Sequence, residues 1–153
     1  MIRADICALA LPTLFGALIV GKAGGAESTP PQPTAAASSR SAGEGVYTLP
    51  QARRGLPVYL RQCSGCHGES FRGGESSPTL LGADFLARWK GLTLADLFAK
   101  IHLMPPNDPG KLSSEQISDV MAAILHANKL PDGESELTTE EAQLATIRFS
   151  MTQ

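Results

Sequence analysis

The chain has 153 residues, of which 42% are hydrophobic and only 5% aromatic, and its formal net charge is −2. This length suits one domain with appendages, and a net charge so close to zero gives no sign of a nucleic-acid partner. Because large rings are scarce, a bound apolar group would supply packing mass that the side chains lack.

Residues 1–26 are typical of a secretory signal peptide. Arg3 supplies positive charge, the apolar residues 6–21 follow, and Gly24 and Ala26 meet the small-x-small rule for cleavage after Ala26. An uncleaved anchor helix is the alternative, although this apolar stretch is short for a membrane span. We therefore expect export to the periplasm, with membrane attachment only if the leader is uncleaved.

Residues 27–45 are rich in Pro, Ala, Ser, Thr and Gly, which predicts a disordered, flexible linker without a packed face. Residues 46–135 carry helical patterns and form the predicted domain. Residues 136–153 are predicted to be a C-terminal extension, with a short helix starting at Thr138. The sequence indicates no strand and no internal repeat.

The first predicted helix begins at Thr48 and leads into a cysteine motif. Thr48 can cap it, Pro50 is tolerated in the first turn, and Gln51 occupies the reciprocal position of a capping box. Apolar residues then repeat at helical spacing as far as Cys63. Pro57 lacks an N–H group, so we expect it to kink or divide this helix.

Residues 63–67 have the sequence CSGCH, the C-x-x-C-H pattern of covalent c-type haem attachment. Cys63 and Cys66 can each add to one haem vinyl group, and the adjacent His67 can then bind the iron. A structural zinc site would need four ligands, yet no cysteine follows Cys66. A thioredoxin-like pair should open a helix rather than close one. The third cysteine, Cys7, lies in the leader, so no structural disulfide is expected.

A glycine-rich loop follows the motif, and helical patterns then resume. Thr93 with Asp96 and Ser113 with Gln116 form the cap pairs of the second and third of these helices. Their apolar residues recur at three- and four-residue spacing. The predicted helices cover residues 83–89, 93–102 and 113–128.

Haem iron in c-type cytochromes commonly takes a methionine opposite its histidine. Met104 lies 37 residues after the histidine of the motif, at a helix end set by two prolines, and is our candidate. Met121 lies on an apolar helix face, which favours core packing, and Met151 lies near the chain end. His102 and, less favoured, His126 are the rival ligands.

These motifs, over residues 43–135, resemble the class I c-type cytochromes. The resemblance implies an all-α, cytochrome c-like fold with three to five helices around one covalently bound haem c. It is carried by CSGCH with its preceding helix, Pro78-Thr79-Leu80-x-Gly82, Leu97-Phe98-x-x-Ile101 leading to Met104-Pro105, and the helix predicted over residues 113–128.

The resemblance also assigns roles to single residues. Cys63 and Cys66 would form thioethers, with His67 as proximal and Met104 as distal ligand. The Pro78 carbonyl would accept a hydrogen bond from His67 Nδ1–H and orient the imidazole.

Other positions of the resemblance concern packing. Gly55 and Tyr59 match the helix face that crosses the helix predicted over residues 113–128. The family usually places an aromatic residue where this chain has Ala123, so we expect a looser or differently packed crossing. Trp89 is expected either to approach a haem propionate or simply to pack in the core.

The expected function is one-electron transfer in a periplasmic respiratory or dehydrogenase-linked chain. Expected partners are a periplasmic dehydrogenase, an oxidase or a cytochrome bc1-type complex. Arg53, Arg54 and Arg61 precede the motif whereas the tail is acidic. This charge separation either orients docking or, as the favoured interpretation, consists of two ordinary solvated faces. The alternatives are an obligate haem subunit of a dehydrogenase and, less favoured, a haem protein that reacts with gases or peroxide.

Overall fold

The computed structural model describes residues 39–75 and 77–150. The predicted signal peptide, its anchor alternative, Met151 and residues 27–38 of the predicted linker lie outside this part of the chain. Within it, no helix combines the length and the apolar character that crossing a membrane requires.

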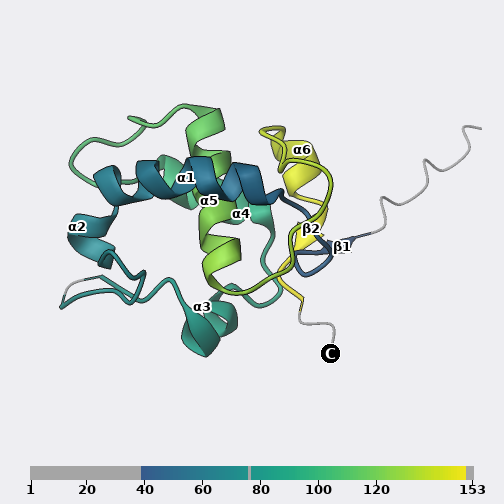
Figure 1. Ribbon diagram of the computed structural model, residues 1–153, viewed down its shortest axis with the longest axis horizontal. Coiled ribbons are helices and arrows are strands. Elements are labelled where there is room, and N and C mark those ends of the chain that lie inside the picture. Colours follow the sequence, from purple (N-terminus) through teal and green to yellow (C-terminus); the bar gives the residue numbers. More distant parts are fainter. Residues whose placement is uncertain (1–38, 76, 151–153) are drawn as a thin grey trace, which may run out of the picture. The chain divides into compact units, whose positions relative to one another are not determined.

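The described residues form six helices and two very short strands (Figure 1). The predicted mainly helical fold is therefore confirmed, although the described residues form six helices rather than three to five and two short strands that were not predicted. The helices after the motif lie close to their predicted positions. Figure 1 shows α1 lying across α5. The elements are β1 (Arg40–Ser41), α1 (Leu49–Gln62), α2 (Ser64–His67), α3 (Gly82–Trp89), α4 (Leu94–His102), α5 (Ser114–Ala127), α6 (Glu141–Leu144) and β2 (Ile147–Arg148).

Local capping explains where α4 and α5 begin. The Thr93 hydroxyl accepts from the backbone N–H of Asp96, whose carboxylate accepts from the backbone N–H of Thr93. Ser113 and Gln116 make the same reciprocal pair at the start of α5. Both predicted capping boxes are confirmed, because each satisfies N–H groups that the first helical turn leaves free.

The start of α1 differs from the prediction. Thr48 accepts from the backbone N–H of Gln51, but the Gln51 side chain is buried and does not complete a capping box. Its amide donates to the Ser118 hydroxyl at 3.2 Å and to the Leu137 carbonyl at 3.0 Å, and it accepts from the Leu137 N–H. Gln51 therefore ties α1 to α5 and to the C-terminal segment. Pro57 is exposed and does not divide α1.

The crossing of α1 and α5 depends on Gly55. A Cβ atom at this position would lie 1.8 Å from the Asp119 carbonyl oxygen and 2.9 Å from the Val120 nitrogen. The two backbones thus approach more closely than any side chain at Gly55 would allow. The crossing that Ala123 was expected to leave looser or differently packed is held by direct backbone contact at Gly55.

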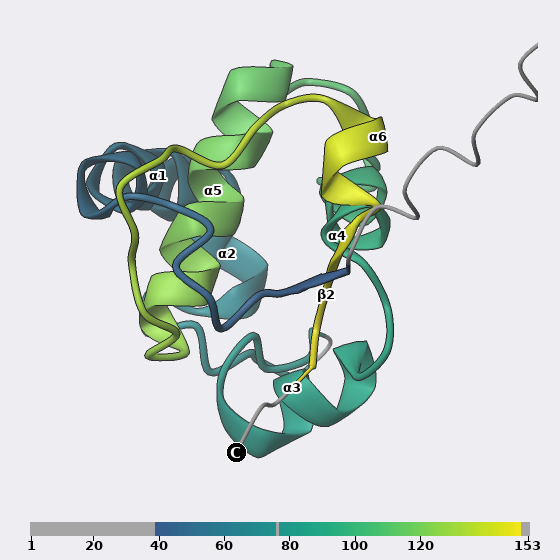
Figure 2. The ribbon, with the colours of Figure 1, turned by 90° about the vertical axis from the view of Figure 1, so that its right-hand side faces the viewer.

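Both ends of the described chain join the same core, which corrects two predicted boundaries. β1 pairs in parallel with β2 (Figure 2), so residues 40–45 are not linker, and Ala42 is buried. The predicted extension is not an appendage either. A two-residue strand is too short to show an alternating pattern in the sequence. The buried residues after position 136 are Leu137, Leu144, Ile147 and Phe149. The last helix begins at Glu141 rather than Thr138.

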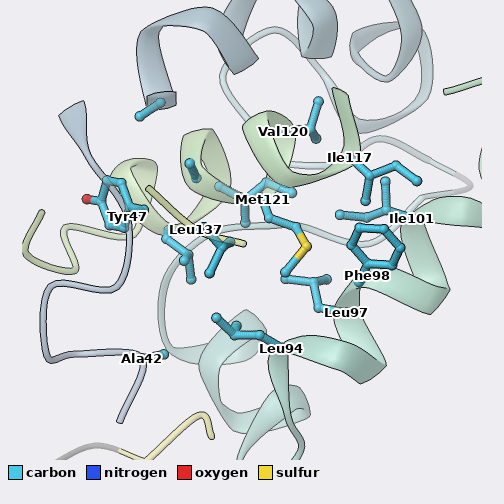
Figure 3. Packing of buried hydrophobic residues seen from close by; sticks show 14 of the residues in the cluster. Ala42, Tyr47, Leu94, Leu97, Phe98, Ile101, Ile117, Val120, Met121 and Leu137 are labelled. Atoms are coloured by element: carbon cyan, nitrogen blue, oxygen red, sulfur yellow. The ribbon is translucent and has the colours of Figure 1, made fainter. Parts of the chain in front are cut away.

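Between α4 and α5 the core is apolar and closely packed (Figure 3). Met121 is fully buried, in the same apolar cluster as Leu94 and Leu97 of α4 (Figure 3). This agrees with the interpretation of Met121 as a core residue, because its side chain is already enclosed by aliphatic neighbours.

The two tyrosines of the sequence are both fully buried and both hydrogen-bonded. The Tyr47 hydroxyl donates to the Leu130 carbonyl, and burial, helped by the charge of Asp132, raises the pKa of Tyr47 to about 12. Burial, with a smaller contribution from Cys63, also raises the pKa of Tyr59 to about 12. The folded state therefore stabilises the neutral form of both phenols.

We expect the tyrosinate absorbance of the folded protein to rise near pH 12, rather than near the ordinary pKa of 10. Because the folded pKa values are raised, their stabilisation is complete below pH 10 and is lost as the pH rises to about 12. Tyr47→Phe should halve the absorbance change. Ultraviolet titration measures this, and a full rise centred near pH 10 would contradict burial of these rings.

Candidate haem site

A cavity of about 520 Å³ opens beside the cysteine motif. This volume lies in the range of cofactor sites, and most of the wall is apolar. Its apolar side chains come from α1, α4 and α5 and from the loop before α3, including Tyr59, Leu80, Leu97, Ile101, Val120 and Ile124. The wall suits a large planar apolar group.

The motif forms one side of this cavity. Helix α1 ends at Gln62, and the short turn α2 follows, closed by the His67 N–H donating to the Cys63 carbonyl at 2.9 Å. Cys63, Cys66 and His67 all line the cavity. Both thiols are free, Cys66 is exposed, and burial together with Cys66 raises the pKa of Cys63 to about 11.

His67 is held by the loop that precedes α3. Its Nδ1 lies 3.0 Å from the Pro78 carbonyl oxygen, a distance that suits Nδ1–H donation and leaves the Nε2 lone pair free. The loop can come this close because Gly73, with φ +80°, packs against the backbone of residues 77–79. A Cβ there would lie 2.6 Å from the Ser77 carbonyl oxygen.

Met104 lines the same cavity as His67. It follows α4, and its N–H donates to the Ile101 carbonyl at 2.9 Å. The structure thus brings together all five predicted site residues, two thiols, an imidazole, a thioether and the Pro78 carbonyl. This donor set fits a covalently bound haem.

The rival ligands lie elsewhere in the described structure. The His102 ring lies 3.8 Å from the position of a Cβ on Gly110 and does not line the cavity. His126 Nδ1 lies 3.4 Å from the Tyr47 hydroxyl, away from the motif.

Two cations on the cavity wall, Arg88 and Lys100, were missed in the sequence. Each stands alone on an exposed part of a helix, a pattern that gives no signal of a site. Trp89 lines the cavity too, and it also packs against Phe85 and Phe149, with ring centroids 6.1 and 5.8 Å away.

Ion pairs at Arg54 neutralise part of the charge separation between the basic residues before the motif and the acidic tail. Arg54 pairs with Asp119 at 3.1 Å and with Glu136 at 2.8 Å, so one of the three arginines is neutralised by the acidic tail itself. Arg53 and Arg61 remain exposed on α1.

The part of the chain that forms this site matches one known protein family. Residues 50–122, from α1 into α5, match the family described as cytochrome c oxidase, cbb3-type, subunit III. The structure is similar to a chain of the sulfane dehydrogenase SoxCD from Paracoccus pantotrophus, with 20% identity and a TM-score of 0.48. That similarity covers 70% of this chain but only 62%, less than two thirds, of the other. No curated protein matches. Residues 50–122 therefore correspond to a c-type cytochrome domain, and the cofactor of such domains is a covalently bound haem c.

Proposed function

We propose that the protein carries single electrons on a haem attached through Cys63 and Cys66, with His67 and Met104 as axial ligands. The observation that supports this most directly is that all four side chains line one cavity. The Pro78 carbonyl, 3.0 Å from His67 Nδ1, would fix the imidazole and increase its basicity.

A bound haem supplies reversible one-electron oxidation of its iron, and the chain sets how that chemistry is used. The Met104 thioether would favour the ferrous state and raise the reduction potential. A haem iron held by both Met104 and His67 would keep no coordination position for oxygen or peroxide. The described cavity wall also carries no Asp or Glu that could move protons. These features favour a carrier over a gas- or peroxide-reactive protein.

Electrons would leave near the two thioethers, because Cys66 is exposed and Cys63 is half-buried. Arg88 and Lys100, at the cavity wall, would meet the haem carboxylates. The partner would be a periplasmic dehydrogenase, oxidase or bc1-type complex, either in brief encounters or as a permanent complex. Support for the periplasm comes from the leader sequence 1–26, and membrane attachment would require that this leader is uncleaved.

Replacing both Cys63 and Cys66 by alanine should leave no haem on the chain after denaturation and extraction. The reason is that no other described thiol lies at the cavity. The wild type should keep its haem and, when reduced, show a low-spin spectrum with split visible bands.

Ser64→Ala is the matched control, because it changes the same turn without removing a thiol, and it should keep the haem. Covalent haem on the double variant would refute the attachment. A high-spin spectrum of the reduced wild type would refute the axial ligands.

A further inference from the structure

Phe71 has an unusual backbone for a bulky residue. Its φ is +62°, in the left-handed region, and its side chain is 8% exposed. Side chains with a Cβ adopt this conformation at an energetic cost, and a bulky residue there indicates that surrounding contacts impose it. Glycine would occupy the position more easily, so the ring of Phe71 must contribute something that glycine cannot.

The ring stacks on Tyr59. Their centroids are 3.8 Å apart, and the planes are inclined by 15°. Tyr59 is fully buried on the cavity wall, and its hydroxyl donates to the Gly68 carbonyl at 2.7 Å. Phe71 does not line the cavity. It therefore supports the wall from behind, at the residue that precedes Cys63 by one helical turn.

The backbone of Phe71 holds the loop opposite His67. Its carbonyl accepts from the Leu80 N–H at 2.8 Å and from the Thr79 hydroxyl at 3.3 Å. These residues directly follow Pro78, whose carbonyl faces His67 Nδ1. One residue thus connects the cavity wall, through its ring, to the loop that contacts the imidazole, through its carbonyl.

We propose that Phe71 is a positioning residue for His67. By stacking on Tyr59, its ring keeps the left-handed backbone in place, and its carbonyl then keeps Pro78 at hydrogen-bonding distance from Nδ1. This inference rests on the proposed function, since it assumes that His67 is the proximal ligand.

The test compares Phe71→Gly with Phe71→Tyr in the full-chain holoprotein. Glycine relaxes the backbone and removes the ring, whereas tyrosine keeps a ring that can stack. The readout is the solvent exchange of His67 Nδ1–H, measured by NMR in the diamagnetic reduced state. Phe71→Gly should accelerate this exchange roughly tenfold or more relative to core amides of α5, because the Pro78 loop opens locally. Phe71→Tyr should exchange as the wild type does.

Unchanged exchange in Phe71→Gly would overturn the proposal, as would equal acceleration at His67 and in α5, which would mean a general loss of stability. If Phe71→Gly does not fold, Phe71→Leu decides, because it keeps apolar volume without a flat ring. In Phe71→Leu, faster exchange of His67 Nδ1–H without faster exchange in α5 supports the proposal. An exchange rate equal to that of the wild type refutes it. A wild type without a low-spin spectrum would instead refute the proposed function, independently of Phe71.

Discussion

Met104→Leu is expected to abolish the weak far-red band of thioether-bound ferric haem and to lower the reduction potential by on the order of hundreds of millivolts. Leucine has nearly the volume of methionine but offers the iron no lone pair. The cavity should keep its shape while one axial position loses its ligand. Visible and near-infrared spectra, together with redox titration, measure both effects.

Met121→Leu is the matched control for this experiment. Met121 is fully buried in the core between α4 and α5 and does not line the cavity. The control should keep the band and the potential, with a stability cost below about 1.5 kcal/mol, because the exchange conserves volume. A band that persists in Met104→Leu would assign the thioether to another methionine. A low-spin spectrum without the band in the wild type would favour a histidine, and His102→Ala would then test the more favoured of the two rival ligands.

Gly55→Ala should destabilise the folded protein by about 3 kcal/mol or more. The added Cβ would lie 1.8 Å from the Asp119 carbonyl oxygen, and that neighbour is helix backbone, which cannot rotate away. Relief requires that α1 and α5 move apart. Such a movement would also disturb the Gln51–Ser118 hydrogen bond and the cavity wall at Tyr59.

Gly65→Ala provides the control, because no atom lies within 4 Å of the Cβ that it would add. Its free energy of unfolding should stay within about 0.5 kcal/mol of the wild-type value. Chemical denaturation of both holoproteins, followed by far-ultraviolet circular dichroism, gives the comparison. Equal stabilities for Gly55→Ala and the wild type would show that the crossing is not held by backbone contact.

The features that could be predicted from the sequence are those governed by neighbours along the chain. CSGCH places two thiols and an imidazole within five residues, so covalent haem attachment needs no knowledge of the fold. The capping boxes at Thr93 and Ser113 act across three residues. Met104 is a candidate ligand by sequence because Pro105 and Pro106 end the preceding helix, and the structure places Met104 on the cavity wall.

The features that could not be predicted depend on partners far along the chain. Gln51 had a local capping role available, but burial against Ser118 and Leu137, the latter 86 residues away, gives its amide three hydrogen bonds. A buried amide is costly unless it is paired, so the assembled core, and not the helix start, sets its conformation.

Contacts between residues far apart in the sequence also explain the two corrected domain boundaries and the conformation of Phe71. By sequence alone, residues 40–45 resemble a linker, but in the fold β1 pairs with β2. By sequence alone, Phe71 is an ordinary loop residue, but in the fold its ring stacks on Tyr59. The cofactor and its attachment follow from five consecutive residues. The enclosure of the cavity, the support behind its wall and the contact between Pro78 and His67 depend on long-range packing, because they join segments that no local pattern connects.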